Sequence, residues 1–175
     1  EKNALEELTK IVNSTNNIYG SIAIEGDITS WLTTLLLATG EHPTRKLIDI
    51  PDSAKVRFLP FLGLFIPKEI VKKIGLPDQG YFIAADDVEY CLRAQKQGAN
   101  IIVAGKSRIN HPKCSHYVQN LFFTTVGCLE LSPWKRYYDT RNRLLIAKKY
   151  FGVKWIFLTL PGSFARHIGV LLHEP

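Results

Sequence analysis

The sequence contains no methionine, few cysteines, and no apolar run of the roughly 20 residues that a membrane-spanning helix needs. Its 175 residues begin at Glu1, so we expect a processed chain or a piece of a longer protein. The three cysteines are odd in number and widely spaced, which argues against a disulfide framework and favours a reducing, cytosolic setting. No signal peptide is visible at the start.

Charge is unevenly distributed along the chain. Lys and Arg number 22 against 16 Asp and Glu, which gives a formal net charge of +6. Seven of the basic residues fall within residues 132–155, where Asp139 is the single acid, and the remainder of the chain is balanced. A local basic segment favours an anionic partner such as a phosphate, a lipid headgroup or a nucleic acid, although a solvated helix face gives the same composition.

Apolar periodicity predicts an α/β fold with a mixed sheet, because helical and extended segments alternate along the chain. Pro67 is placed to open a helix and Gly75 to end it. Gly98 similarly closes a helix that begins near residue 86. Helices are predicted at 1–12, 67–74, 86–97, 134–151 and in the tail through Leu172, and strands at 18–24, 58–66 and 100–104.

Two segments give less regular patterns. Residues 25–55 contain an apolar run that is followed by Gly40, Pro43 and Pro51, which predicts a long excursion with a short helix. Residues 118–131 alternate between apolar and polar, which predicts a loop or an edge strand. We therefore expect one domain part at residues 1–131 and basic, amphipathic C-terminal helices at residues 132–175.

An acidic pair, Asp86-Asp87, stands where a loop leads into a helix. Asp86 and Glu89 have the spacing of a capping box, and Glu89 can pair with Arg93 along the exposed face. The pair could simply cap the helix, or one carboxylate could point outward as a general base, with a pKa set by its neighbour and the helix dipole. The inner stripe of this helix is expected to comprise Val88, Cys91, Leu92 and Gln95.

An ordered set of motifs resembles a known enzyme family. The set comprises the acidic pair within Gly80–Gly98, the preceding Phe65–Asp78, the later Asn110-His111-Pro112, and Tyr137-Tyr138 with Arg141-Asn142-Arg143. Over roughly residues 1–152 these motifs are similar to family 2 glycosyltransferases with the GT-A fold, and most similar to the rhamnosyl- and galactofuranosyl-transferases. The resemblance implies the acceptor-side half of that mixed-sheet α/β fold.

The resemblance also implies roles for individual residues. In the family the second acid of the pair is the general base, which implies that Asp87 takes the proton from an acceptor hydroxyl as it attacks a nucleotide-diphosphate sugar with inversion. Asp86 would hold the acceptor or orient Asp87. His111 is similar to a histidine that in the family ligates Mn²⁺ or Mg²⁺. This cation offsets the negative charge of the departing diphosphate. A zinc cluster with Cys114 and His116 is the alternative, although structural zinc usually takes four ligands.

Four further residues are candidate substrate contacts. Trp134 could stack on a sugar ring, and Glu89 lies one turn after the acidic pair. Arg141 and Arg143 are two residues apart and therefore point to different helix faces, so that one of them could reach a phosphate.

The family binds its nucleotide through an N-terminal half that ends in a DxD-type metal motif, and this chain has none. We therefore expect an enzyme that is incomplete without that half, with a glycan or lipid-linked acceptor and no nucleic-acid partner. The tail after Trp155 is predicted to be either an interfacial membrane element or a core-packing helix pair. The expected location is cytoplasmic, and peripheral on the inner face of the cell membrane if the tail binds lipid. The alternative function is a non-catalytic basic module that binds a membrane surface or nucleic acid.

Overall fold

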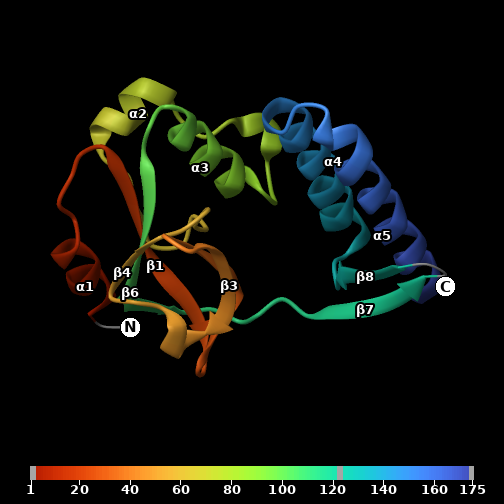
Figure 1. The fold of residues 1–175 in the computed structure, drawn as a ribbon, viewed down its shortest axis with the longest axis horizontal. Coiled ribbons are helices and arrows are strands. Elements are labelled where there is room, and N and C mark those ends of the chain that lie inside the picture. Colours follow the sequence, from red (N-terminus) through yellow and green to blue (C-terminus); the bar gives the residue numbers. More distant parts are fainter. Residues whose placement is uncertain (1–2, 122–123, 174–175) are drawn as a thin grey trace. The chain divides into compact units, whose positions relative to one another are not determined.

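The computed structural model describes residues 3–121 and 124–173, and it has the mixed α/β architecture with C-terminal helices that the sequence predicts. The chain forms two compact units. The sheet unit comprises the residues up to Asp78 together with Asp87–Lys113. The helical unit comprises Gln79–Asp86 and the residues from Cys114 onward. Figure 1 shows the elements of both units.

A curled, six-stranded mixed sheet forms the centre of the sheet unit. Its strands are β1 (Asn17–Glu25), β2 (Ile28–Leu37), β3 (Gly40–Lys46), β4 (Ser53–Lys55), β5 (Leu64–Phe65) and β6 (Asn100–Asn110). The strand order is β3-β2-β1-β6-β4, and β5 pairs with the first half of β1. Among the described strands, only β1 and β6 pair in parallel. Val56 bridges back to Leu35 of β2, so the sheet curls toward its own second strand.

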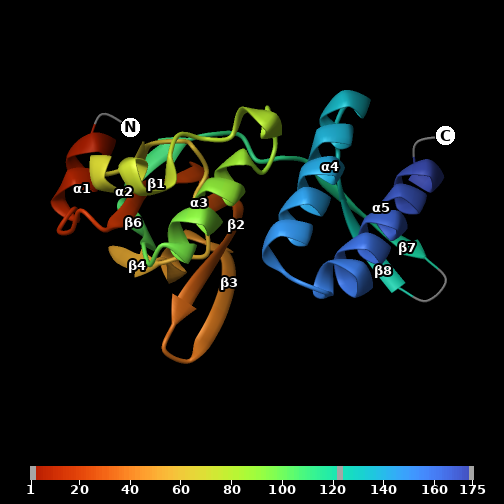
Figure 2. The same ribbon diagram turned by 90° about the horizontal axis from the view of Figure 1, so that it is seen from above.

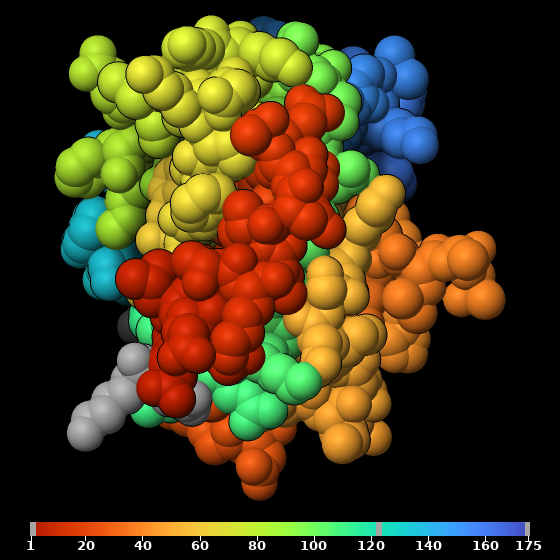
Figure 3. All heavy atoms as spheres, turned by 90° about the vertical axis from the view of Figure 1, so that its left-hand side faces the viewer, coloured from red at the N-terminus to blue at the C-terminus, as the bar shows by residue number. Residues whose placement is uncertain are grey.

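Helices cover both faces of this sheet. Alternate residues of a strand point to opposite sides, so apolar side chains on each face need a helix to pack against. The helices are α1 (Ala4–Lys10), α2 (Lys68–Ile74) and α3 (Asp86–Lys96), with a 3₁₀ turn at Leu47–Asp49. Ile18 and Ile101 enter the main core together with Cys91 of α3. On the opposite face, Tyr19 packs against Leu8 of α1. Figure 3 looks directly onto α1, drawn in red.

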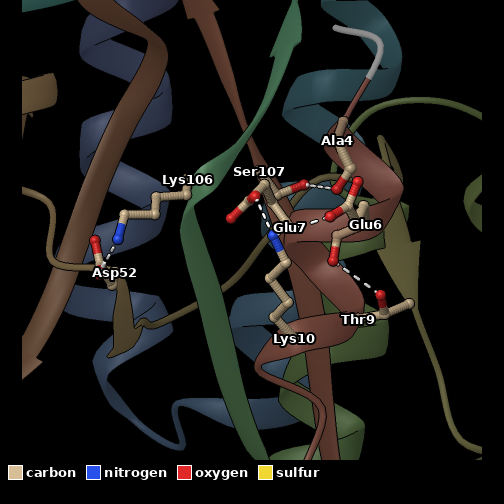
Figure 4. A network of polar contacts seen from close by, with 8 residues as sticks. All are labelled: Ala4, Glu6, Glu7, Thr9, Lys10, Asp52, Lys106 and Ser107. Carbon is tan, nitrogen blue, oxygen red and sulfur yellow. Dashed lines mark hydrogen bonds and ion pairs between the residues drawn. The ribbon is translucent and has the colours of Figure 1, made fainter.

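A buried serine attaches α1 to the sheet (Figure 4). The hydroxyl of Ser107 donates to the carbonyl oxygen of Ala4 at 2.5 Å and lies 2.8 Å from the hydroxyl of Ser21. Lys10 pairs with Glu6 and Glu7 on the exposed side of the same helix. Such exposed pairs contribute little to stability, so the contacts of Leu8 and Ser107 hold the helix in place.

Residues 25–55 are the largest departure from the sequence prediction. The expected irregular excursion is wrong, because the segment forms β2, β3 and β4, and its one short helix is the 3₁₀ turn at Leu47–Asp49. Gly26 and Gly40 adopt positive φ angles of 62° and 119° at the two turns, where glycine meets no steric penalty. Pro43 lies in β3 at the edge of the sheet, where a missing N–H is tolerated.

The predicted strand at residues 58–66 is reduced to the two residues of β5. Pro60 and Gly63 interrupt it, and Gly63 has a φ of 66°. The helices predicted after Pro67 and from residue 86 are confirmed, and Gly75 and Gly98 follow them with positive φ. Both helices depend on signals that are local in sequence, which is why the sequence finds them.

The helical unit contains two long helices and a hairpin. Its elements are a 3₁₀ turn at Gln79–Tyr81, β7 (His116–Leu121), β8 (Thr124–Leu129), α4 (Pro133–Tyr150), a π-helix at Trp155–Thr159 and α5 (Leu160–His173). The predicted helix at 134–151 is confirmed, and the segment from 118 proves to be one antiparallel hairpin. The hairpin lies beside α5 (Figure 2), where the ring of Tyr117 stacks on His173 at 3.8 Å.

Candidate functional site

The loop that leads into the acidic pair has a strained backbone. Phe82, Ala84 and Ala85 have φ angles of 55°, 67° and 62°, and they are the only non-glycine residues with positive φ in the described part of the chain. A left-handed conformation costs roughly 1–2 kcal/mol for a residue with a β-carbon. Such strain persists only where the surroundings fix it, and it gathers at functional sites.

Two adjacent residues of α4 hold this loop. The side-chain nitrogen of Asn142 lies 2.8 Å from each of the carbonyl oxygens of Tyr81, Ile83 and Ala84, and its two hydrogens are shared among them. Asn142 is fully buried. Arg141 donates to the carbonyl oxygen of Gly80 at 2.9 Å. We call this arrangement the loop clamp; it shows that the Arg-Asn motif of α4 fixes the backbone before Asp86.

Asp87 lies in the first turn of α3, which begins with Asp86. Its Oδ1 accepts a hydrogen bond from the backbone N–H of Val88 at 2.7 Å. Cys91 follows one turn later and is completely buried. Burial raises the pKa of the Cys91 thiol to about 12, and the charge of Asp87 adds to the shift.

The predicted position of Glu89 on the exposed face is wrong. Its side chain is 1% exposed, and it pairs with Arg93 at 2.9 Å, as the spacing predicts. Arg93 also donates to the carbonyl oxygen of Ile74 at 2.6 Å, which ties α3 to the end of α2. Glu89 thus serves the packing of the two helices, and we do not assign it to substrate.

The inner stripe of α3 also differs from the prediction. Of the four residues expected there, only Cys91 belongs to the buried set of the helix, which is completed by Glu89, Tyr90 and Ala94. Tyr90 is buried because its hydroxyl donates to the carbonyl oxygen of Gly75 at 3.0 Å while its ring packs in the core. A paired carboxylate and a tyrosine with a hydrogen-bond acceptor can be buried, and sequence alone does not reveal those partners.

His111 follows the last residue of β6 and is fixed from several sides. Its backbone N–H donates to the carbonyl oxygen of Ile24 at 3.0 Å, and its carbonyl oxygen accepts from the hydroxyl of Ser30 at 2.5 Å. The centre of its ring lies 4.6 Å from that of Trp31. Nδ1 lies 2.7 Å from the carbonyl oxygen of Pro112. Because a carbonyl only accepts, Nδ1 is the donor in this contact, and Nε2 is the ring nitrogen left to face a metal ion. This is the arrangement that metal-ligating histidines commonly show.

Within the described residues, no group of three or more His, Cys, Asp and Glu side chains is placed to hold a metal ion. The alternative zinc cluster of His111, Cys114 and His116 is therefore not formed among them. A metal ion at His111 would require ligands from another segment or from a substrate.

A shallow hollow in the sheet unit is lined by residues of β1, β2 and the segment 58–60, and neither His111 nor Asp87 lines it. One wall is Trp31, whose ring packs on His111. Another is Leu59, whose carbonyl oxygen lies 3.7 Å from the sulfur of Cys91, one turn after Asp87. Sequence reasoning missed Trp31, because the strand that carries it was predicted as an irregular excursion.

Exposed aromatic side chains gather beside the clamped loop in the helical unit. The ring of Tyr138 lies 5.3 Å from Phe82, 6.5 Å from Trp134 and 5.2 Å from Tyr137. Phe82 is 69% exposed although it carries a strained backbone, and Trp134 and Tyr137 are exposed as well. We call these four residues the aromatic patch. Trp134 was a candidate from sequence; Phe82 was missed, because a positive φ at phenylalanine has no sequence signal.

The two candidate arginines of α4 serve different contacts, as their spacing predicts. Arg141 belongs to the loop clamp, whereas Arg143 pairs with Asp139 through both carboxylate oxygens at 2.9 Å. Burial lowers the pKa of nearby Arg166, and the charge of Arg143 lowers it further. Arg141 is therefore the arginine associated with the loop before the acidic pair.

Neither a scan against models of known protein families nor a search of curated proteins gives a match to this chain.

Proposed function

We propose that this chain is the acceptor-side part of an inverting, nucleotide-sugar-dependent glycosyltransferase with the GT-A fold, and that Asp87 is its general base. The observation that carries the proposal is the strained loop directly before Asp86-Asp87, held by the buried amide of Asn142. Two aspartates that only cap a helix need neither the strain nor the clamp. A site that must present a carboxylate in one orientation benefits from both.

In the proposed reaction Asp87 takes the proton of an acceptor hydroxyl while that oxygen forms a bond to the anomeric carbon of the donor. The bond from this carbon to the diphosphate oxygen breaks on the opposite side, so the configuration inverts and a nucleoside diphosphate leaves. Asp86, the preceding residue, would hold the acceptor or orient Asp87. A divalent cation, Mn²⁺ or Mg²⁺, would be held by Nε2 of His111 with acids of the nucleotide-binding half, and its charge would offset that of the diphosphate.

The aromatic patch would supply the acceptor contacts. Aromatic rings offer apolar faces against which the C–H faces of a sugar ring can pack. One member of the patch, Phe82, belongs to the loop that runs directly into Asp86 and Asp87. The acceptor class that fits this patch is a glycan or a lipid-linked sugar, with Trp134 and Phe82 as its main contacts.

The proposal is tested by nucleotide-sugar turnover in the full protein that includes the nucleotide-binding half, with Mn²⁺ or Mg²⁺ present. We expect the Asp87→Asn variant to lose about 10²- to 10⁴-fold in kcat, the usual contribution of a general base. Asp52→Asn is the matched control, because Asp52 is an exposed aspartate that pairs with Lys106. Undiminished transfer by Asp87→Asn, or no turnover of any nucleotide sugar by the unaltered protein, would contradict the proposal.

A further inference from the structure

The last helix of the described chain exposes its large apolar side chains and buries small residues. The π-helix and α5 together form one helical segment, Trp155–His173. Its outward face consists of Phe157, Leu160, Phe164, Ile168 and Leu171, which recur at spacings of three and four residues and are all exposed. Its inward face, toward the rest of the helical unit, carries the buried Ser163 and Gly169. The large apolar side chains therefore point away from the protein and the small or polar ones toward it.

This arrangement is the reverse of that of an ordinary surface helix, which buries its apolar stripe and exposes its polar one. Phe157, Phe164 and Leu171 are 73%, 70% and 71% exposed. Only 11% of the apolar stretch within Trp155–His173 is buried. Each large apolar side chain gains about 1.5–3 kcal/mol when it leaves water. A continuous stripe of this kind therefore marks a surface that meets an apolar partner.

The charges beside the outward face identify the partner. No aspartate or glutamate occurs between Asp139 and Glu174, whereas Lys148, Lys149 and Lys154 stand at the turn between α4 and the segment. All three lysines are exposed. A bilayer with anionic headgroups presents an apolar interior beneath a negative surface, and it matches both features at once.

The inward face determines how the helix meets the bilayer. Nineteen residues of helix extend for about 28 Å, close to the thickness of the hydrocarbon layer, so the segment is long and apolar enough to cross a membrane. The sequence analysis found no such run, because Arg166, His167 and the pair Pro161-Gly162 interrupt it. However, the hairpin packs on the inward face, and a β-carbon on Gly169 would lie 3.0 Å from Val126. A spanning helix would carry this hairpin into the hydrocarbon.

We propose that Trp155–His173 lies flat at the surface of an anionic membrane, with its outward face in the acyl boundary and the three lysines on the headgroups. This membrane binding is independent of the glycosyltransferase proposal, since it involves neither Asp87 nor the loop clamp. It would hold the helical unit, including the aromatic patch, at the membrane surface. An acceptor anchored in the same membrane would then be reached by diffusion in two dimensions.

The test is co-sedimentation of the full chain with vesicles of phosphatidylcholine alone or with about one third phosphatidylglycerol. We expect binding to the anionic vesicles, at least tenfold weaker binding by the triple variant Phe157→Gln/Phe164→Gln/Leu171→Gln, and loss of the anionic preference in Lys148→Glu/Lys149→Glu/Lys154→Glu. The matched control is Leu5→Gln/Ile48→Gln/Leu76→Gln, three apolar residues of the sheet unit that are exposed by at least 71%. This control variant is expected to bind like the unaltered chain.

Three results would overturn the proposal. The first is failure of the unaltered chain to bind anionic vesicles, and the second is equal binding by the outward-face triple variant. The third is a concentration-dependent dimer in sedimentation velocity that the same triple variant abolishes while vesicles remain unbound, which would assign the face to a second copy of the chain. Circular dichroism of each variant confirms folding, and turnover of nucleotide sugars reports separately on the proposed catalytic function.

Discussion

The two units of this chain differ in how far they bury their large apolar side chains. In the sheet unit, aliphatic side chains from the central strands and from α3 enter a continuous core. Among the described residues, both buried hydrophobic clusters belong to this unit. In the helical unit the buried set includes Asn142 and Ser163, while phenylalanines and leucines of the last helix face outward. The first unit is held by burial, and the second combines a polar clamp with a surface suited to an apolar partner.

This difference separates two tasks. A well-packed sheet can hold His111 and the start of α3 in fixed positions, because its strands and helices share one core. The helical unit buries Ile146 and Ala147 but uses hydrogen bonds to shape a short loop and leaves the large apolar side chains of its last helix exposed. Truncation of an apolar side chain should therefore cost much more stability in the sheet unit than on the outward face of the last helix, which makes the comparison testable.

The largest expected effect concerns removal of an aliphatic side chain. Ile101→Ala, in the core of the sheet unit, should lower the free energy of unfolding by about 2–5 kcal/mol, because it loses burial and leaves a cavity. Leu171→Ala, on the outward face, should change it by less than about 0.5 kcal/mol in the absence of lipid. Urea unfolding of both variants measures the difference, and equal losses would show that the two units are packed alike.

The next effect concerns the loop clamp. Asn142→Ala leaves the carbonyl oxygens of Tyr81, Ile83 and Ala84 without their amide donor, so it should cost about 1–3 kcal/mol. Hydrogen exchange of the Ile83 amide, which donates to Tyr81 within the same loop, should accelerate.

Arg143→Ala is the neighbouring control for the clamp, because it removes only an exposed ion pair with Asp139 and should cost less than about 1 kcal/mol. Unchanged exchange in Asn142→Ala would mean that the loop holds its strained conformation without the clamp.

The smallest effect is the pH dependence from the sheet core. Burial raises the pKa of the Cys91 thiol from 9.0 to about 12, so above pH 9 the unfolded chain loses this proton while the folded chain keeps it. The unfolded state is thereby favoured, and stability should fall by about 2 kcal/mol between pH 8 and pH 10.5. Below pH 9 the thiol is protonated in both states and contributes nothing.

This decline is isolated by comparing unfolding curves of the unaltered chain and Cys91→Ala under reducing conditions. The variant should lack the Cys91 component and keep the shared titration of lysines and tyrosines. Cys114→Ala, a half-buried cysteine, should follow the unaltered chain. Parallel pH curves for the unaltered chain and Cys91→Ala would show that the thiol is accessible to water in the folded state.

Local signals explain what could be predicted about the fold. The helix after Pro67, the helix from the acidic pair and the long basic helix were found because proline, glycine and apolar spacing act within a few residues. The hairpin of β2 and β3 was missed because its apolar run resembles a helix segment and its edge strand contains Pro43. Strand pairing, which the sequence does not show, decided between the two.

In the candidate site too, local sequence patterns placed some residues, and contacts between distant segments placed the others. The sequence located Asp86, Asp87 and His111, since a carboxylate pair at a helix start and a histidine after a strand are visible as patterns. It placed Glu89 on the wrong face of α3, because burial of that carboxylate depends on Arg93 and on carbonyl groups of another helix. It also missed Trp31 and Phe82, whose positions depend on a strand pairing and on a strained backbone.

By itself, the sequence determined the mixed α/β character, the helices that follow Pro67 and begin near residues 86 and 134, the basic segment and the position of an acidic pair at a helix start. These follow from spacing, capping and charge, which operate between near neighbours. Only the tertiary structure decided the curl of the sheet, the clamp on the loop and the outward direction of the last apolar face. Each of these depends on contacts between residues far apart in the chain, and periodicity alone cannot say which side of a helix meets the protein.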